Sequence, residues 1–373
     1  MHSPNIQYNP RLDQLRWLAA TLVFLFHFHL EYRGAGGAGL TGGWTALVTE
    51  GHTGVGLFFT LSGFLFMQIA LHQHAAGREI AYGDFLRNRV LRILPLYLVI
   101  YLLATSIGRD KFQPQDLLYL VVSNLGLAPT SGTVVTGAAW TISLEFLFYL
   151  VFPFLARFTL ARGIAYLGGW LVLMAFFKVA AYTVNENSTL MYFSTWVGRF
   201  DQFLIGMAAA MLHARWQARL ARFAPVLLLA SVMLVMWDTA LMHRIAPFGA
   251  TPKSSFWVYW SMLESAGWAA LILSWVSFAA RLPGPLERVL GQGGKVSFSF
   301  YLLHMGLLHI FAVRFKLVAP TGVSWVDAAI MFAVCYGATW ALATLCYHIV
   351  EEPFLRMRRS YGEARSAPAA HVS

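Results

Sequence analysis

Apolar runs recur along the whole chain, and this feature restricts the fold more than any other. Each run has roughly 20 residues, enough to cross about 30 Å of hydrocarbon as an α-helix. The 373 residues are 58% hydrophobic and only 12% charged, which excludes an ordinary water-soluble domain. The sequence therefore predicts an all-α polytopic membrane protein with no sizeable soluble domain.

We expect about ten transmembrane helices. The predicted spans are residues 12–32, 52–72, 90–108, 138–156, 163–183, 197–214, 224–242, 256–280, 296–314 and 326–349. The stretch 113–129 is also apolar, but it is too short and too interrupted to span, so we interpret it as an interfacial or re-entrant segment. Counting it as a span would reverse the orientation of everything that follows.

The placement of lysine and arginine tests this topology. With ten spans and a cytoplasmic N-terminus, eighteen basic residues face the cytoplasm and seven face outward. This asymmetry is the one that the positive-inside rule expects, and it places both termini in the cytoplasm. It also accounts for most of the net charge of +10, which is therefore weak evidence for nucleic-acid binding.

Two residues whose side chains are unfavourable inside a membrane lie on one face of the first predicted span. Arg16 and His27 are eleven residues apart, so at about 100° per residue they lie within roughly 20° of each other around the helix. A histidine inside the membrane is compatible with a functional site. The alternative is structural: Arg16 reaches the cytoplasmic interface, and His27 forms a hydrogen bond with a neighbouring helix.

The fourth predicted span carries a carboxylate in an apolar run, "WTISLEFLFYLVFP", with Ser143 two residues before Glu145. A buried carboxylate needs a partner. If the span enters from outside, Glu145 and His27 lie at similar depths, so we expect them to meet as a tuned general base. A purely structural ion pair is the alternative.

A basic cluster follows the second span in "FLRNRVLRILPLY", where Arg89 and Arg92 are three residues apart. Guanidinium groups bind phosphates bidentately, so this pair suits a nucleotide-like ligand from the cytoplasm. Ordinary anchoring at the membrane surface is the alternative.

Other polar residues inside the predicted spans, or just past the end of one, are weaker signals. Ser62 lies in "GVGLFFTLSGFLF", His304 in "VSFSFYLLHMGLLH", and Glu351 in "YHIVEEPF", where it could pair with an arginine. Taken singly, each of these residues fits a structural role better than a functional one.

Together these stretches resemble the membrane acyltransferase 3 family. The resemblance rests on the ordered set "RLDQLRWLAATLVFLFHF", "GVGLFFTLSGFLF", "RNRVLRILPLY", "WTISLEFLFYLVFP", "FSFYLLH" and "HIVEEPF", which covers nearly the whole chain. Two positions depart from the family pattern. Thr141 stands where serine is usual, and Glu352 stands where a basic residue often precedes the proline.

The resemblance implies an integral membrane O-acyltransferase of the inner membrane. Such an enzyme moves an acyl group, most often acetyl, from cytoplasmic acyl-CoA to a hydroxyl of an extracytoplasmic glycan or glycolipid, such as an exopolysaccharide or lipopolysaccharide. His27 and Glu145 are then the catalytic residues, and Arg16, Arg89 and Arg92 bind acyl-CoA. No metal is expected.

Four further residues and one competing function complete these expectations. Possible supporting residues are Ser62, Ser143, His304 and Glu351. The alternative function is a secondary transporter or flippase for a glycan or lipid, with the intramembrane charges as a relay. We expect residues 1–360 to form the transmembrane domain and residues 361–373 to be a short, disordered cytoplasmic tail.

Overall fold

The structure is a computed structural model that describes residues 9–40, 45–108, 110, 113–121, 134–184, 188–247, 253–314 and 321–364. The longer helices are α1 (Pro10–Gly34), α3 (Thr53–Ala75), α4 (Tyr82–Ile107), α5 (Val134–Arg162), α6 (Ile164–Val184), α8 (Trp196–Ile245), α9 (Phe256–Ser277), α10 (Gly284–Arg314) and α11 (Ser324–Cys346). The shorter elements are α2 (Ala46–Thr49), β1 (Arg78–Ile80), the 3-10 helix η3 (Pro114–Val121), α7 (Ser188–Ser194), the π-helix η4 (Tyr347–Glu351), α12 (Glu352–Leu355) and β2 (Gly362–Ala364).

Helices dominate the described residues, as predicted for an all-α membrane protein. Seven of these helices are long and apolar enough to cross a membrane. One of the seven, α8, contains both predicted spans 197–214 and 224–242, and its backbone leaves the helical conformation at Trp216. Helices α1 and α9 are outside the seven, because α1 begins with several charged residues and α9 contains four tryptophans and Glu264. The count of ten spans and the side of the termini stay predictions.

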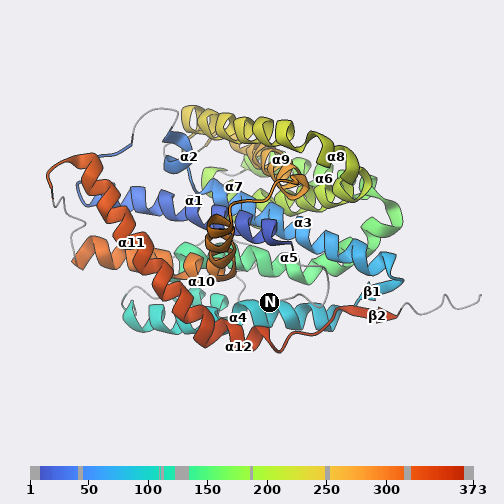
Figure 1. The fold of residues 1–373 in the computed structure, drawn as a ribbon, viewed down its shortest axis with the longest axis horizontal. Coiled ribbons are helices and arrows are strands. Elements are labelled where there is room, and N and C mark those ends of the chain that lie inside the picture. The colour runs from blue at the N-terminus through green and yellow to red at the C-terminus, as the bar shows by residue number, and fades with distance from the viewer. Residues whose placement is uncertain are drawn as a thin grey trace, which may run out of the picture.

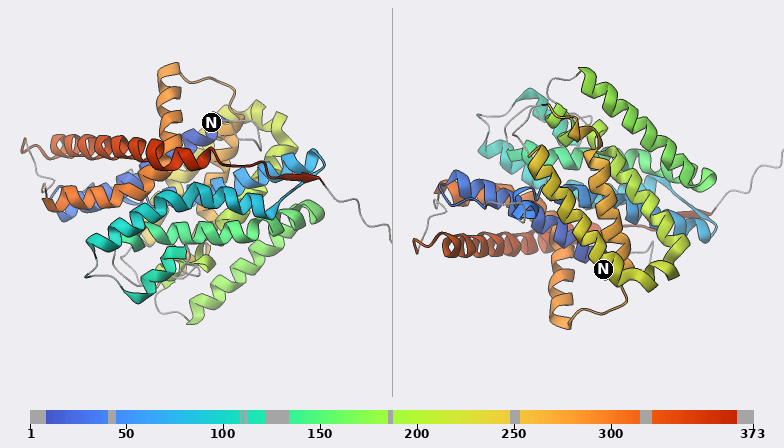
Figure 2. Two further views of the ribbon diagram at one scale, coloured as in Figure 1. Left: turned by 90° about the horizontal axis from the view of Figure 1, so that it is seen from below. Right: turned by 90° about the horizontal axis from the view of Figure 1, so that it is seen from above.

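The helices form one bundle around α1 and α3 (Figure 1). Helices α6, α8 and α9 pack together on one side of α3, and α5 lies between α3 and α4 on the other side. Helices α10 and α11 flank α1, and α11 continues through η4 into α12, which contacts α4 (Figures 1 and 2). This arrangement brings α1, α3, α4, α5 and α10 around a common interior space.

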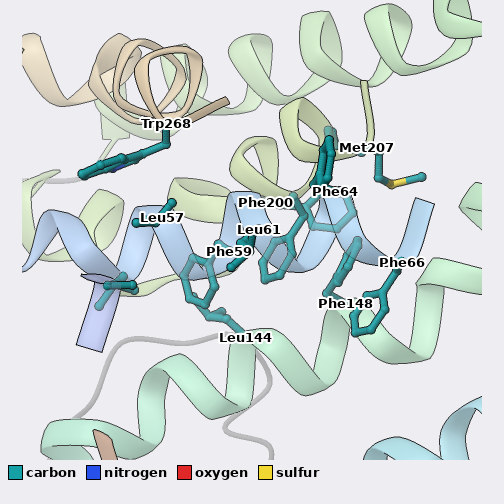
Figure 3. Close-up of a cluster of buried hydrophobic side chains, with 14 of the residues drawn as sticks. Leu57, Phe59, Leu61, Phe64, Phe66, Leu144, Phe148, Phe200, Met207 and Trp268 are labelled. Carbon is teal, nitrogen blue, oxygen red and sulfur yellow. The ribbon is translucent and has the colours of Figure 1, made fainter. Parts of the chain in front are cut away.

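The core around α3 is packed with aromatic side chains. Figure 3 shows Phe59, Phe64 and Phe66 of α3 in one cluster with Phe148 of α5 and Phe200 of α8. The rings of Phe148 and Phe203 stack with centroids 4.1 Å apart, and Phe59 lies 4.7 Å from Phe203. Aromatic pairs at such distances stabilise a core beyond their buried area. Helix α3 is therefore held on both faces.

The outward faces of several helices are apolar. Leu102 and Ile107 of α4 are 58% and 81% exposed, and Val172 and Val184 of α6 are 72% and 83% exposed. Large apolar side chains exposed in a row are unfavourable in water but match the hydrocarbon of a bilayer. The bundle therefore presents a surface suited to lipid.

The end of the chain differs from the predicted disordered tail. Strand β2 pairs antiparallel with β1, in the register Arg78↔Ala364, and Tyr361 is only 1% exposed. The folded domain therefore extends past residue 360 to at least Ala364, and the rest of the predicted tail, 365–373, lies outside the described residues. Of the predicted interfacial segment 113–129, the structure describes residues 113–121, and Pro114–Val121 form η3.

Candidate active site

A cavity of about 260 Å³ lies between α1, α3, α4, α5, α10 and the segment after α11. Its apolar wall includes Phe58, Phe59, Leu61 and Leu65, all from α3. Its basic side chains are Arg16, Arg89, Arg92, Lys295 and Arg358, and its acidic side chains are Asp13 and Glu145. The lining is thus apolar along α3 and positively charged at the end near Tyr361 and β2.

Arg89 and Arg92 both line this cavity. The Arg89 Nη2 donates to the hydroxyl of Tyr361 at 2.6 Å, and its guanidinium carbon lies 5.0 Å from the ring centroid of Phe66. The Arg92 Nη1 donates to Glu351 Oε2 at 3.1 Å, and Ser299 donates to the other oxygen of Glu351. The pairing of Glu351 with an arginine is therefore present in the structure.

Arg16, Ser62 and Glu145 also line the cavity. The Arg16 Nη1 donates to Asp13 Oδ1 at 2.5 Å, one helical turn earlier in α1. The Ser62 hydroxyl donates to Glu145 Oε1 at 2.9 Å, and Tyr149, one turn further along α5, interacts with the same carboxylate. The partner that a carboxylate at this depth needs is thus supplied by hydroxyl groups of α3 and α5.

His27 and His304 form a pair between α1 and α10. The His27 Nδ1 lies 2.9 Å from the carbonyl oxygen of Val23 and 3.1 Å from His304 Nε2, and His304 Nδ1 lies 2.5 Å from the carbonyl oxygen of Tyr301. Because a carbonyl oxygen only accepts, the neutral rings each carry their proton on Nδ1. His27 Nε2 then keeps its lone pair, as a general base requires.

The expected contact between His27 and Glu145 is wrong. His27 interacts with His52, at the start of α3, whereas Glu145 contacts Ser62, ten residues further along the same helix. Ten helical residues correspond to about 15 Å along the axis. The expected depth was wrong because α5 begins at Val134, so Glu145 lies deeper than a span beginning at residue 138 implied.

Tyr301 separates the cavity from the histidine pair. Its hydroxyl forms a hydrogen bond with Thr141 Oγ1 at 2.8 Å, its side chain lines the cavity, and its ring centroid is 5.5 Å from that of His304. Tyr301 was not among the predicted site residues, although it stands one helical turn before His304 in "FSFYLLH". Ser143, in contrast, is buried outside the cavity lining.

A second polar cluster ties α6, α8 and α9 together. Lys178 Nζ donates to Asp201 Oδ2 at 2.5 Å, and Arg199 Nη1 donates to Glu264 Oε2 at 3.0 Å. All four side chains are at most 1% exposed. The available signal was the presence of four charged residues in otherwise apolar helices, which requires pairing inside the bundle. Within the described ranges, no three His, Cys, Asp or Glu side chains converge as a metal site.

Comparison with known proteins identifies the class. The profile of a family described as an acyltransferase domain, Acyl_transf_3, matches residues 9–347. Acyltransferase MdmB of Streptomyces mycarofaciens is 28% identical over 340 residues, which cover 81% of this chain and 79% of the relative. Nodulation protein 10 of Rhizobium leguminosarum bv. viciae is 27% identical over 390 residues, covering 93% and 94%.

A putative O-acetyltransferase of Staphylococcus aureus is 22% identical over 388 residues, which cover 94% of this chain and 58% of that longer relative. No solved structure matches the chain significantly. Because the family profile spans most of the sequence, the chain belongs to the Acyl_transf_3 family of acyltransferases. Its apolar helices make it a multi-pass membrane protein of that family.

Proposed function

We propose that the protein is an O-acyltransferase of the inner membrane that transfers an acyl group, acetyl in the first instance, from cytoplasmic acyl-CoA to a hydroxyl of an extracytoplasmic glycan or glycolipid. One observation carries the proposal. A cavity with basic side chains at one end reaches Tyr301, and the His27–His304 pair lies directly beyond Tyr301. Such a site suits a long anionic donor whose reactive end must reach a base.

The relatives support the type of reaction. The names of two relatives include acyltransferase and O-acetyltransferase. Both names describe transfer of an acyl group, and the second specifies acetyl transfer to oxygen. We extend this chemistry to the present chain on the strength of the family membership and of the cavity.

The donor fits the cavity in one orientation. Its phosphates are attracted to the guanidinium groups of Arg89 and Arg92, and its pantetheine arm extends along the apolar wall of α3 towards Tyr301. Phe66, which contacts Arg89, and His52, near His27, are fourteen residues apart, or about 20 Å along a helix. An extended arm is therefore needed to bring the thioester to His27.

The chemistry is then general base catalysis. His27 Nε2 accepts the proton of the acceptor hydroxyl as its oxygen attacks the thioester carbonyl carbon. The carbon–sulfur bond breaks, the ester forms, and the proton passes to the departing thiolate, so the products are the acyl ester and free coenzyme A. Holding both substrates beside His27 makes this step effectively intramolecular.

The decisive experiment is acyl transfer by the purified full-length protein in detergent, with radiolabelled acetyl-CoA. We expect His27→Ala to lower the rate by about 10²–10⁴-fold, the usual contribution of a general base. His309→Ala is the matched control, because His309 lies on α10 but is 55% exposed. Wild-type rates in a well-folded His27→Ala protein would refute the assignment.

Two further measurements separate the function from its alternatives. A transporter or flippase for a glycan or lipid would leave the label on acetyl-CoA in every variant. Mass spectrometry of surface polysaccharides and glycolipids from cells with and without the protein would identify the acceptor. Equal acetylation in both samples would contradict a glycan acceptor.

A further inference from the structure

The chain after α12 folds back onto the start of α4, and we call residues 356–364 the strap. Asn88, which is fully buried, donates from Nδ2 to the carbonyl oxygen of Arg359 at 2.7 Å and accepts from its backbone N–H at 2.9 Å. Arg87 Nη1 donates to the carbonyl oxygen of Met357 at 2.9 Å. Two polar side chains of α4 are thus committed to the backbone of the strap.

The pairing of β2 with β1 continues this attachment, and the backbone N–H of Ala81 donates to the carbonyl oxygen of Tyr361 at 2.7 Å. A buried polar side chain such as Asn88 must be hydrogen-bonded. The strap supplies these hydrogen bonds, so α4 depends on the strap being in place. It lies beyond residue 347, where the match to the family profile ends.

The strap supplies two side chains to the cavity, Arg358 and Tyr361. Tyr361 accepts a hydrogen bond from Arg89 and so fixes its guanidinium group. Arg358 Nε donates to the carbonyl oxygen of Leu355 at 3.0 Å. Burial, together with the positive charges of Arg89 and Arg92, lowers the pKa of Arg358 to about 10. Like charges are therefore gathered at this end of the cavity.

The acids near the cavity offset only part of this charge. Among the residues that the structure describes, five basic side chains line the cavity against the carboxylates of Asp13 and Glu145, with Glu351 behind Arg92. Asp13 is bound to Arg16, and Glu145 is bound to Ser62. A surplus of partly desolvated cations is unfavourable unless an anion joins them. The end of the cavity near the strap therefore suits a doubly charged ligand group.

We propose that Arg358 of the strap, together with Arg89 and Lys295, forms a phosphate-binding site at this end of the cavity. The ligand class is a phosphorylated nucleotide, and its identity as coenzyme A rests on the proposed function. A guanidinium fork binds two phosphate oxygens at once. Docking of the strap and binding of phosphate then stabilise each other, because the strap carries one of the ligands.

The test is the affinity of the full-length protein in detergent for coenzyme A and for pantetheine, which lacks the phosphates. We expect Arg358→Gln to weaken the binding of coenzyme A at least about tenfold, which is the effect of losing a charge-assisted hydrogen bond. The affinity for pantetheine should not change. Arg356→Gln is the control, because Arg356 belongs to the same strap but is 73% exposed and outside the cavity lining. Unchanged affinity of Arg358→Gln for coenzyme A would overturn the proposal.

A measurement on the unaltered protein covers the case in which Arg358→Gln does not fold. Trypsin cleaves after Arg356, Arg358 and Arg359 when the strap detaches, so saturating coenzyme A should slow this cleavage at least fivefold, while pantetheine should not. Equal cleavage rates with and without coenzyme A would refute the site. If coenzyme A binding depends on Arg358 but the protein shows no acyl-transfer activity, the proposed function is refuted and the phosphate-binding site is not.

Discussion

At the scale of single residues, the histidine pair explains how His27 is oriented. The carbonyl oxygens of Val23 and Tyr301 each hold one ring proton, so the two rings share a defined tautomer. A base must present its lone pair to the substrate before the reaction starts, and hydrogen bonds to its other nitrogen usually fix this geometry. His304 is therefore a positioning residue for His27 in the proposed mechanism.

This role predicts that a change at His304 lowers the catalytic rate but leaves substrate binding nearly unchanged. We expect His304→Ala to lower kcat about 10–100-fold and to leave KM for acetyl-CoA within about twofold, because His304 is outside the lining of the cavity to which we assign the donor. His304→Gln, which still places an acceptor near His27, should recover part of the rate. A rise in KM with unchanged kcat would contradict the assignment.

Sequence could predict these residues singly but not their pairing. Arg89, Arg92, Glu145 and Ser62 were found as polar groups in apolar runs, and all four line the cavity. The contact between His27 and Glu145 failed because it depended on the relative depth of two helices. Depth depends on where each helix starts and on the stagger of α1 against α3, which no local pattern encodes.

At the scale of elements, two glycines let α3 and α8 approach closely. A Cβ atom on Gly63 would lie 2.1 Å from the carbonyl oxygen of Phe203, and one on Gly206 would lie 2.0 Å from that of Thr60. Each glycine thus faces the backbone of the other helix. Small residues permit this kind of approach between membrane helices, where packing replaces the hydrophobic effect.

We therefore expect Gly206→Ala to destabilise the protein by about 1–3 kcal/mol, the usual cost of overpacking. The thermal unfolding midpoint in detergent should fall. Gly168→Ala in α6 is the control, because nothing lies within 4 Å of the added methyl group, and alanine is the better helix former. Equal midpoints for the two variants would show that α3 and α8 can separate without cost.

The elements themselves were predictable to different degrees. Length and hydropathy located the long helices, because a helix in lipid must satisfy its own backbone. The two strands were missed, since each has three residues and pairs Arg78 with Ala364, far apart in the sequence. A run of three residues carries too little periodicity to be recognised as a strand.

At the scale of the whole molecule, the open question is how many times the chain crosses the bilayer. Seven helices qualify by length and hydropathy. Ten crossings require that α1 and α9 also span and that α8 crosses twice, with its bend near Trp216 at the cytoplasmic surface. The basic residues on either side of this bend support that position under the positive-inside rule.

Thiol labelling in intact cells checks the ten-crossing topology. Starting from a variant without Cys335 and Cys346, single cysteines are placed at Arg33, Arg219 or Arg244, all of which are exposed. An impermeant maleimide should label positions 33 and 244 at once, and position 219 only after permeabilisation. Labelling of 219 and 244 from the same side would show that α8 crosses only once or lies along the surface.

The hydrogen bond between Tyr301 and Thr141 has a consequence for the cell's energy supply. When a cavity opens to one side of a membrane and the histidine rings lie just beyond its end, less protein separates the two sides of the membrane at that point. Ions and protons driven by the membrane potential, about 2.3 kcal/mol per charge at 100 mV, would leak most easily at that point. The phenol ring of Tyr301, held by Thr141, is the side chain that stands between the cavity and His304. If the enzyme joins substrates from two compartments, as we propose, it must also keep those compartments electrically apart.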